Sequence, residues 1–373
     1  MNYWFLIDLS VLLCVMLLTG IIIPQILLIA FRKNLFDVPD PRKIHKTEVP
    51  RLGGIAFFPS IMLAIFLLYG FGSMCPIESV RDALSQNIRP VCFVASGAIL
   101  LYLTGMADDL VGVRYKAKFI MQTISAGLVI IGGVLLNDFH GFIGIGPVPM
   151  IVAVLITILL MVFIINAINL IDGIDGLASG LSAIACAFYA YVFFESGLYI
   201  FSAFAVATLG ALVPFFMYNV FGNPEKHRKI FMGDTGALTV GLFLGVMSIR
   251  ICQIETHTNG ANTAVIGFAP LLIPCFDVVR VYLHRIKAHR NPFLPDKTHI
   301  HHKLLALGMR QRMAMMTIIG CSALWTAANY LISPYVNITL LFSCDLALWI
   351  VVNTILTHSI HAREKSLSQT LYD

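Results

Sequence analysis

The chain has 373 residues, of which 58% are hydrophobic and only 12% are charged, and its formal net charge is +5. A soluble domain carries about 25% charged residues, so this composition excludes an ordinary soluble globular protein. It predicts an all-α polytopic membrane protein with a single integral membrane domain, residues 1–373, and no nucleic-acid partner, because basic residues in such proteins usually mark cytoplasmic loops.

Apolar segments long enough to cross a bilayer recur along the whole chain. A helix needs about 20 apolar residues to cross the hydrocarbon. Eleven segments qualify, centred near residues 18, 62, 99, 127, 160, 186, 208, 241, 273, 323 and 346. The first, from Trp4 to Phe31, is too long for a signal peptide and lacks a basic leader, so it is predicted to stay as a transmembrane helix. Only a short turn at Glu195–Gly197 separates the sixth and seventh, and residues 140–149 read as a short hairpin.

The basic residues are distributed unequally between the loops. Of the 25 Lys and Arg residues, 21 fall in the segments 32–51, 114–118, 226–229, 285–312 and 363–365. With eleven spans, all these segments lie on one side of the membrane. The positive-inside rule then predicts an outside N-terminus and a cytoplasmic C-terminus.

The eight cysteines are scattered and form no CxxC pair. Most lie inside apolar runs and are interpreted as small core residues. A disulfide between Cys75 and Cys252, which fall near segment ends, is the one pairing left open.

Acidic residues gather at span ends on the predicted cytoplasmic side. Asp108 and Asp109 end the third span in GMADDLVG, Asp172 and Asp175 follow the fifth in NAINLIDGIDGLASG, and Asp234 opens the eighth in FMGDTGALTVG. Acids in or beside a transmembrane segment are costly and usually functional. The alternative is that span ends are simply polar, and for Asp234 that it is a helix N-cap.

Cations, glycines and histidines fall on the same predicted side. Lys43 and Arg51 lie in RKIHKTEVPRLGG, and Lys116 and Lys118 follow the first aspartate pair. The stretch THIHHKLLALG carries His299, His301 and His302. Taken alone, these histidines fit a metal site, a phosphate site or a solvated loop.

The combination of residue types favours one chemistry. Carboxylates suit Mg²⁺, which usually shares its ligands with substrate phosphates, and basic side chains suit phosphates. Zinc prefers His or Cys sets, and HEXXH is absent. The residues therefore predict a Mg²⁺-dependent site for a phosphorylated soluble substrate at the cytoplasmic membrane surface, with a lipid phosphate as the second substrate.

Five stretches together resemble a known family. DVPDPRKIHKTEVPRLGG, GMADDLVGVRYKAKF, NAINLIDGIDGLASG, FMGDTGALTVG and NPFLPDKTHIHHKLLALG occur in the order and between the spans typical of the polyprenyl-phosphate N-acetylhexosamine-1-phosphate transferases, glycosyltransferase family 4. The resemblance covers nearly the whole chain. The HIHH form and the eleven spans are similar to the bacterial WecA-type branch rather than to the peptidoglycan branch.

The resemblance implies a role for each matching residue. Asp234 matches the Mg²⁺-binding aspartate, with Mn²⁺ as a substitute ion, and Asp108 and Asp109 match the catalytic pair. The three histidines match the catalytic histidine motif near the diphosphate. Further matches are expected to bind substrate: Lys118, Asn169, Asp172, Asp175, Asn219 and Phe231. Lys43, Arg51, Lys116 and Arg290 are also expected to bind substrate. Within this set, Phe231 matches the position that stacks on uracil, and Asn219 is the weaker match because the loop after it is longer than in some relatives.

The function implied is transfer of a sugar-1-phosphate, with GlcNAc as the commonest sugar, from a UDP-N-acetyl sugar to undecaprenyl phosphate. UMP is released, and a lipid-linked surface polysaccharide is started in the bacterial cytoplasmic membrane. Direct attack by the lipid phosphate and an aspartyl-phosphate intermediate both remain open, as does a homodimer. A secondary transporter with an acidic cytoplasmic site is the alternative, although transporter acids belong near the midplane of broken helices.

Overall fold

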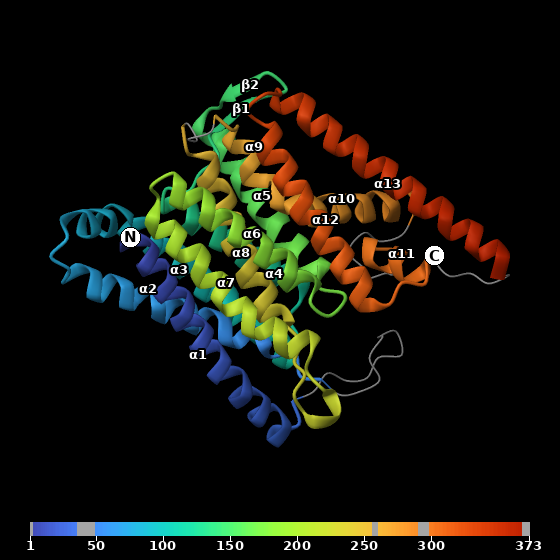
Figure 1. Ribbon diagram of the computed structural model, residues 1–373, viewed down its shortest axis with the longest axis horizontal. Coiled ribbons are helices and arrows are strands. Elements are labelled where there is room, and N and C mark those ends of the chain that lie inside the picture. The colour runs from blue at the N-terminus through green and yellow to red at the C-terminus, as the bar shows by residue number, and fades with distance from the viewer. Residues whose placement is uncertain (1–2, 36–48, 256–259, 290–297, 368–373) are drawn as a thin grey trace.

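The computed structural model describes residues 3–35, 49–255, 260–289 and 298–367 as a bundle of helices with one small hairpin (Figure 1). The helices are α1 Tyr3–Lys33, α2 Phe57–Ser73, α3 Glu78–Val111, α4 Tyr115–Ile131, α5 Met150–Ile171, α6 Leu177–Glu195, α7 Tyr199–Val220, α8 Gly233–Cys252, α9 Thr263–Phe268, α10 Leu272–Lys287, α11 Ile300–Ala306, α12 Gln311–Ile332 and α13 Ile338–Leu367. The strands β1 Asp138–Phe142 and β2 Ile145–Pro147 pair antiparallel, with Phe142 opposite Ile145, which confirms the hairpin expected there.

Ten helical segments of the described chain are long and apolar enough to cross a membrane, so the multi-pass prediction is confirmed. The expected span near residue 273 is α9 and α10 joined by a short 3₁₀ turn, Thr263–Lys287. The eleventh expected span corresponds to α4, which has only 17 residues. Loop residues 132–137 continue α4 toward the hairpin.

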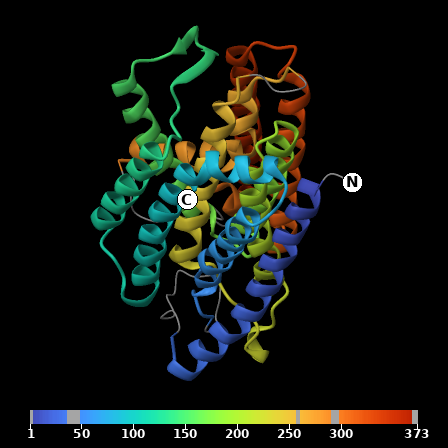
Figure 2. The same ribbon diagram turned by 90° about the vertical axis from the view of Figure 1, so that its left-hand side faces the viewer.

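Contacts at the helix ends show that the helices run between two opposite ends of the bundle. At the hairpin end, the carbonyl of Cys252, the last residue of α8, lies 2.7 Å from His140 Nε2 of β1. The segment after α4 reaches the same end, because Gln253 Nε2 donates to the carbonyl of Gly133 at 2.9 Å. Since α4 starts beside the N-terminus of α8, where Lys118 contacts Asp234, its two ends lie near the two ends of α8. An eleventh crossing by α4 stays a prediction. Figure 2 shows the hairpin at the top and the C-terminal end of α1 at the bottom.

Helix α8 forms the centre of the bundle and is almost entirely buried. Helices α3 and α5 pack directly along it, and small residues permit the close approach. A Cβ on Gly105 of α3 would overlap the backbone of Thr235, and a Cβ on Gly241 would overlap the backbone of Ile165 in α5. The close packing therefore fixes the position of the α8 N-terminus relative to the C-terminal ends of α3 and α5.

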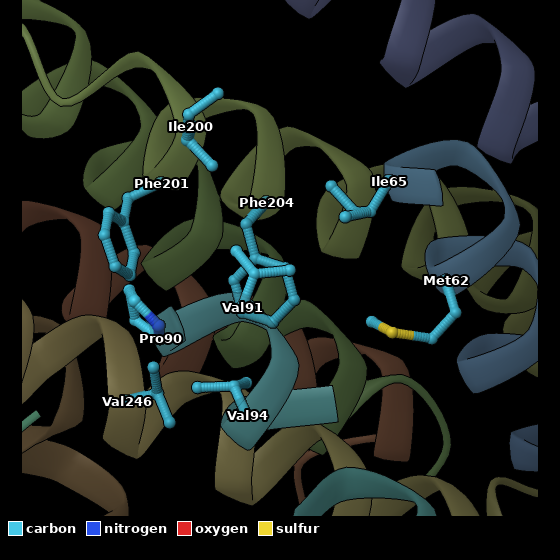
Figure 3. A pocket seen from close by; sticks show the side chains of 9 residues that line it. All are labelled: Met62, Ile65, Pro90, Val91, Val94, Ile200, Phe201, Phe204 and Val246. Atoms are coloured by element: carbon cyan, nitrogen blue, oxygen red, sulfur yellow. The ribbon is translucent and has the colours of Figure 1, made fainter. Parts of the chain in front are cut away.

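A small cavity of about 20 Å³ lies between α2, α3, α7 and α8, and Figure 3 shows the side chains that enclose it. All nine lining residues are apolar, among them Met62, Val94 and Phe204. A buried water needs two to four polar partners, so this cavity is expected to stay dry and to bind no polar substrate.

Candidate active site

Two carboxylates and one ammonium group meet where α3, α4 and α8 converge. Lys118 Nζ lies 2.9 Å from Asp108 Oδ2 and 2.6 Å from Asp234 Oδ2. Asn169, at the end of α5, donates to the same Asp234 oxygen at 3.1 Å. Four residues of the sequence prediction are thus brought together, and both carboxylates already share a cation.

Asp109 contacts the N-terminus of α8. Its Oδ1 accepts from the backbone N–H of Asp234 at 2.8 Å, and its Oδ2 accepts from the N–H and the hydroxyl of Thr235 at 2.9 and 2.6 Å. A helix N-terminus leaves backbone N–H groups without intrahelical partners, and a carboxylate from another segment satisfies them well. Asp109 therefore provides the cap. Asp234, considered above as an N-cap, lies in the first turn and directs its side chain to Lys118 and Asn169.

The loop before α2 pairs with the segment that leads into α8. The N–H groups of Gly53 and Gly54 donate to the carbonyls of Phe231 and Met232, and Phe231 N–H donates to the carbonyl of Pro50. Gly233 has φ +71° and approaches both Arg51 and Asp109, so a side chain there would collide with them. This pairing brings Arg51 and Phe231 to the edge of the carboxylate cluster. Phe231 is partly buried, with Lys229 Nζ 5.8 Å from its ring centroid.

The IDGID loop after α5 supplies two more carboxylates. Asp175 forms an ion pair with Lys229 at 2.5 Å. Burial raises the pKa of Asp172 to about 7; the neighbouring charges of Asp175, Asp234 and Asp109 also raise it, whereas Arg51 opposes them. A carboxyl group with this pKa changes charge near neutral pH, as is common at functional sites.

The histidine segment reaches the same loop. The His301 imidazole lies against the Cα of Gly173, where a Cβ would overlap it. His301 is 1% exposed, and neither ring nitrogen has a hydrogen-bond partner. Burial, with the charges of His302 and His299, lowers its pKa to about 3, so the ring is neutral at pH 7. The His301 and His302 ring centroids are 4.2 Å apart.

His299 is oriented by a carboxylate that the sequence analysis did not identify. Its Nδ1 lies 2.9 Å from Oδ2 of Asp277, which is fully buried in α10. Asp277 Oδ1 accepts from the N–H of Ile300 at 3.0 Å and from Arg280 at 2.8 Å. The sequence does contain a signal for Asp277: it is an acid within the apolar run LLIPCFDVVRV, and intramembrane acids are usually functional. Lys229 and Thr235 are further contacts that the sequence analysis did not assign.

Other predicted residues have different surroundings. Lys116 is exposed on the first turn of α4. Asn219 is buried and joins two loops, accepting from Gly176 N–H at 2.6 Å and donating to the carbonyl of Ile230 at 2.8 Å. Lys43 and Arg290 lie outside the described residues. Cys75 and Cys252 are both free thiols, so the disulfide left open does not form.

The oxygen ligands at this site bear on the predicted Mg²⁺ ion. Within the described residues, no three His, Cys, Asp or Glu side chains are arranged to hold a metal by themselves. Mg²⁺ is usually held by one or two carboxylates together with substrate phosphates and waters, and Asp108 and Asp234 provide two carboxylates within reach of one cation. The Lys118 ammonium between Asp108 and Asp234 marks a position where these carboxylates stabilise positive charge.

Comparisons with known proteins identify the relatives of this chain. The profile of Glycosyl transferase family 4 matches residues 91–252. The chain is 30% identical over 329 residues to the decaprenyl-phosphate N-acetylglucosaminephosphotransferase of Mycolicibacterium smegmatis, covering 82% of this chain and 78% of that protein. It is 30% identical over 313 residues to a probable undecaprenyl-phosphate N-acetylglucosaminyl 1-phosphate transferase of Bacillus subtilis (82% and 79% covered). It is 27% identical over 301 residues to the undecaprenyl-phosphate alpha-N-acetylglucosaminyl 1-phosphate transferase of Yersinia pestis (79% and 76% covered).

Proposed function

The chain belongs to glycosyl transferase family 4 and is a membrane-bound polyprenyl-phosphate N-acetylhexosamine-1-phosphate transferase, and from this premise we propose that it transfers GlcNAc-1-phosphate from UDP-GlcNAc to undecaprenyl phosphate and releases UMP. The observation that carries the proposal is the convergence of Asp108, Lys118, Asn169 and Asp234 at one end of α8. A transporter site would be expected near the midplane of broken helices. This cluster lies instead at helix ends.

The geometry supports direct attack by the acceptor. A phosphate monoester has a second pKa of about 6 and is mostly dianionic at pH 7, so it needs little activation. Both oxygens of Asp109 are engaged by the N-terminus of α8, which disfavours Asp109 as a nucleophile. Asp108 lies beside Lys118 and is proposed to position the acceptor or to take a residual proton.

The remaining site residues are assigned to the donor. His301 offers two unpartnered ring nitrogens in a buried position, and a neutral imidazole can donate to one phosphate oxygen. His299, held by Asp277, and His302 are proposed to contact the diphosphate with it. Phe231 is proposed to stack on uracil, while Asp172 and Asp175 line the nucleotide side. Asp234 and Asp108 would hold Mg²⁺, which neutralises charge on the diphosphate when bound.

We also propose that the carboxylate end faces the bacterial cytoplasm. The helix directions put the N-terminus at the hairpin end and the C-terminus at the carboxylate end, together with the 16 of the 21 basic residues counted above that the structure describes. A reporter fused to the C-terminus should read cytoplasmic, and one inserted at Ile143–Gly144 in the hairpin should read outside. Two reporters on the same side would contradict this orientation. A homodimer stays a prediction.

The donor experiment uses purified protein, undecaprenyl phosphate and a panel of radiolabelled UDP-sugars. Lipid-linked sugar phosphate and UMP are expected with UDP-GlcNAc. Activity with UDP-GalNAc alone would correct the sugar and keep the mechanism. Release of UDP instead of UMP would contradict the proposed reaction, because UDP forms only when the sugar moves without its phosphate. Counterflow uptake of substrate without product would support the transporter.

A further inference from the structure

Helix α11 carries His301 and His302 but has only seven residues. An isolated helix shorter than about 12–15 residues is marginal in water, so α11 depends on its neighbours for its orientation. It packs against α12 and against the C-terminal half of α13 (Figure 1). The packing around α11 therefore decides where the two imidazoles point.

The start of α11 is held by α10. Asp277 accepts from the N–H of Ile300 at 3.0 Å and lies 2.9 Å from His299 Nδ1. Arg280, one turn further along α10, donates to the carbonyl of Thr298. All these contacts are made by the residues that lead into the helix and by its first residue.

The second half of α11 is held from another direction, by α13. Residues 301 and 303 are separated by about 200° around a helix axis, so His301 faces Gly173 of the IDGID loop while Lys303 faces α13. Lys303 is buried, and its ammonium donates to Thr357 Oγ1 at 2.9 Å and to Asn353 Oδ1 at 3.1 Å. The contact that holds Lys303 therefore also fixes the rotation that turns His301 toward the IDGID loop.

Both acceptors on α13 are oriented by hydrogen bonds of their own. Asn353 Nδ2 donates to the carbonyl of Trp349 at 3.1 Å, which leaves its Oδ1 to face Lys303. The Thr357 hydroxyl donates to the carbonyl of Asn353 at 2.8 Å, so its oxygen is available as an acceptor. The two side chains thus complement a Lys ammonium, which can only donate.

A second contact from α13 lies at the C-terminus of α11. Arg363 Nη1 donates to the carbonyl of Ala306, the last residue of the helix, at 3.3 Å. Gly308 follows with φ +86°, and a Cβ at this position would overlap the Arg363 guanidinium. Carbonyl groups at a helix C-terminus lack intrahelical partners and carry partial negative charge, so a cation there is stabilising.

The two contacts lie on one stripe of α13. Asn353, Thr357, Ile360 and Arg363 recur every three or four residues and therefore share one face of the helix. Ile360, between the two contacts, is fully buried. The C-terminal end of α13 is thus docked along this face, and α11 lies at both polar contacts.

We propose that Lys303 and Arg363 are positioning residues, through which the C-terminal end of α13 holds the histidines of α11 toward the IDGID loop. The inference rests on the proposed function, in which His301 and His302 contact the donor diphosphate. Lys303 and Arg363 act through the orientation of α11 and do not themselves contact the donor. Loss of either contact should therefore impair use of the UDP-sugar and leave use of the acceptor unchanged.

Two threonines of α13 provide a matched pair for the first test. Thr354 and Thr357 both donate to the carbonyl four residues earlier, at 2.8 Å each, and Thr357 in addition accepts from Lys303. Lys303→Met and Thr357→Val should each lower kcat/KM for the UDP-sugar about tenfold, equivalent to about 1.4 kcal/mol, whereas Thr354→Val should match wild type. The KM for undecaprenyl phosphate should stay unchanged. Equal losses in the two threonine variants, or a rise confined to the acceptor KM, would overturn the proposal.

The contact at the helix C-terminus is tested in the same way. Arg363→Met should also lower kcat/KM for the UDP-sugar, and Arg363→Lys should restore most of it, because an ammonium can still donate to one carbonyl. Lys365→Met, on the exposed side of the same turn, is the matched control and should match wild type. Wild-type kcat/KM in Arg363→Met would exclude Arg363 as a positioning residue.

A double variant tests whether Lys303 acts through His301. In a His301→Ala background, Lys303→Met should cause a much smaller loss of kcat/KM than it causes in the wild type, because the imidazole that it orients is already absent. An undiminished loss would show that Lys303 acts independently of this histidine and would overturn the proposal.

Hydrogen exchange provides a readout independent of turnover. The amides of α11 should exchange faster in Lys303→Met and Arg363→Met than in the wild type, while the amides of α10 keep the wild-type rate. Unchanged exchange in α11, in an enzyme whose wild type releases UMP, would overturn the positioning role and leave the proposed function intact. Faster exchange in an enzyme that releases UMP from no UDP-sugar would support the positioning by α13 while the proposed function fails.

Discussion

Replacement of Asp109 by Asn tests whether this carboxylate acts on substrate or holds the N-terminus of α8. The carboxylate accepts three hydrogen bonds, one on Oδ1 and two on Oδ2, from Asp234 and Thr235. An Asn side chain has a single oxygen, so in either orientation its NH₂ group faces at least one backbone N–H. The change therefore leaves one donor without an acceptor and removes a negative charge from a helix N-terminus.

The size of the effect follows from these contacts. An unsatisfied buried N–H costs about 1–3 kcal/mol, and loss of a favourable charge at a helix N-terminus costs about 0.3–1 kcal/mol. Since Asp109 is only partly buried, we expect the lower half of the combined range, about 1.3–2.7 kcal/mol. Turnover should also fall, because the first turn of α8 carries Asp234.

The assay is unfolding in detergent, followed in parallel with UMP release. Asp109→Asn should lower the stability, and Thr235→Val, which removes only the hydroxyl donor, should lower it by about 1 kcal/mol. The double variant should lose less than the sum, because both changes act on one cluster. If Asp109→Asn keeps wild-type stability but loses most of its turnover, this reasoning is refuted, and Asp109 would instead act by direct contact with substrate.

Three further changes test the site. Asp234→Asn should reduce turnover by orders of magnitude and abolish stabilisation of the nucleotide complex by Mg²⁺, with little loss of expression; normal Mg²⁺-dependent activity would exclude it as a metal ligand. Gly173→Ala should displace His301 and raise the KM for the UDP-sugar, whereas Gly127→Ala on open space in α4 should leave this KM unchanged. For Asp172, the folded-state pKa is raised from 3.8 to about 7, so ionisation costs stability as pH rises through this window. The melting temperature of wild type relative to that of Asp172→Asn should therefore fall from about pH 4 to about pH 7 and stay constant above pH 7. A melting-temperature difference independent of pH would contradict the raised pKa.

The sequence was sufficient to predict the membrane class, the hairpin and the convergence of the acids. Hydropathy and the distribution of basic residues depend only on local composition, so both can be read from the sequence without knowledge of how the helices pack. The sequence placed Lys118 a short loop after the aspartate pair, and the structure pairs it with Asp108. Contacts between distant helices were harder to predict. Lys118 also reaches Asp234, but this contact depends on how α3, α4 and α8 pack, which no local sequence pattern indicates.

Roles were harder to predict than locations. Asp108 and Asp109 are adjacent and look equivalent in GMADDLVG, yet one turns to Lys118 and the other to the backbone of α8. Helical geometry separates neighbouring side chains by about 100°, so adjacent acids face different partners. Asn219 is a second example, because its side chain makes two hydrogen bonds to the backbone of neighbouring loops and so has a structural role that its position in the sequence does not indicate.

The charge balance of the site explains why a divalent cation is expected. Within the described residues, the five site aspartates are accompanied by Lys118, Lys229 and Arg51, which leaves an excess of two negative charges. Asp109 offsets part of its charge against the N-terminus of α8, and Asp172 is partly protonated near pH 7. A UDP-sugar adds a negatively charged diphosphate to this surplus, so the donor would be repelled unless positive charge arrives with it. Mg²⁺ held by Asp108 and Asp234 together with the donor would supply that positive charge, and chelation should therefore raise the KM for the UDP-sugar more than the KM for the acceptor, which adds no diphosphate to the site.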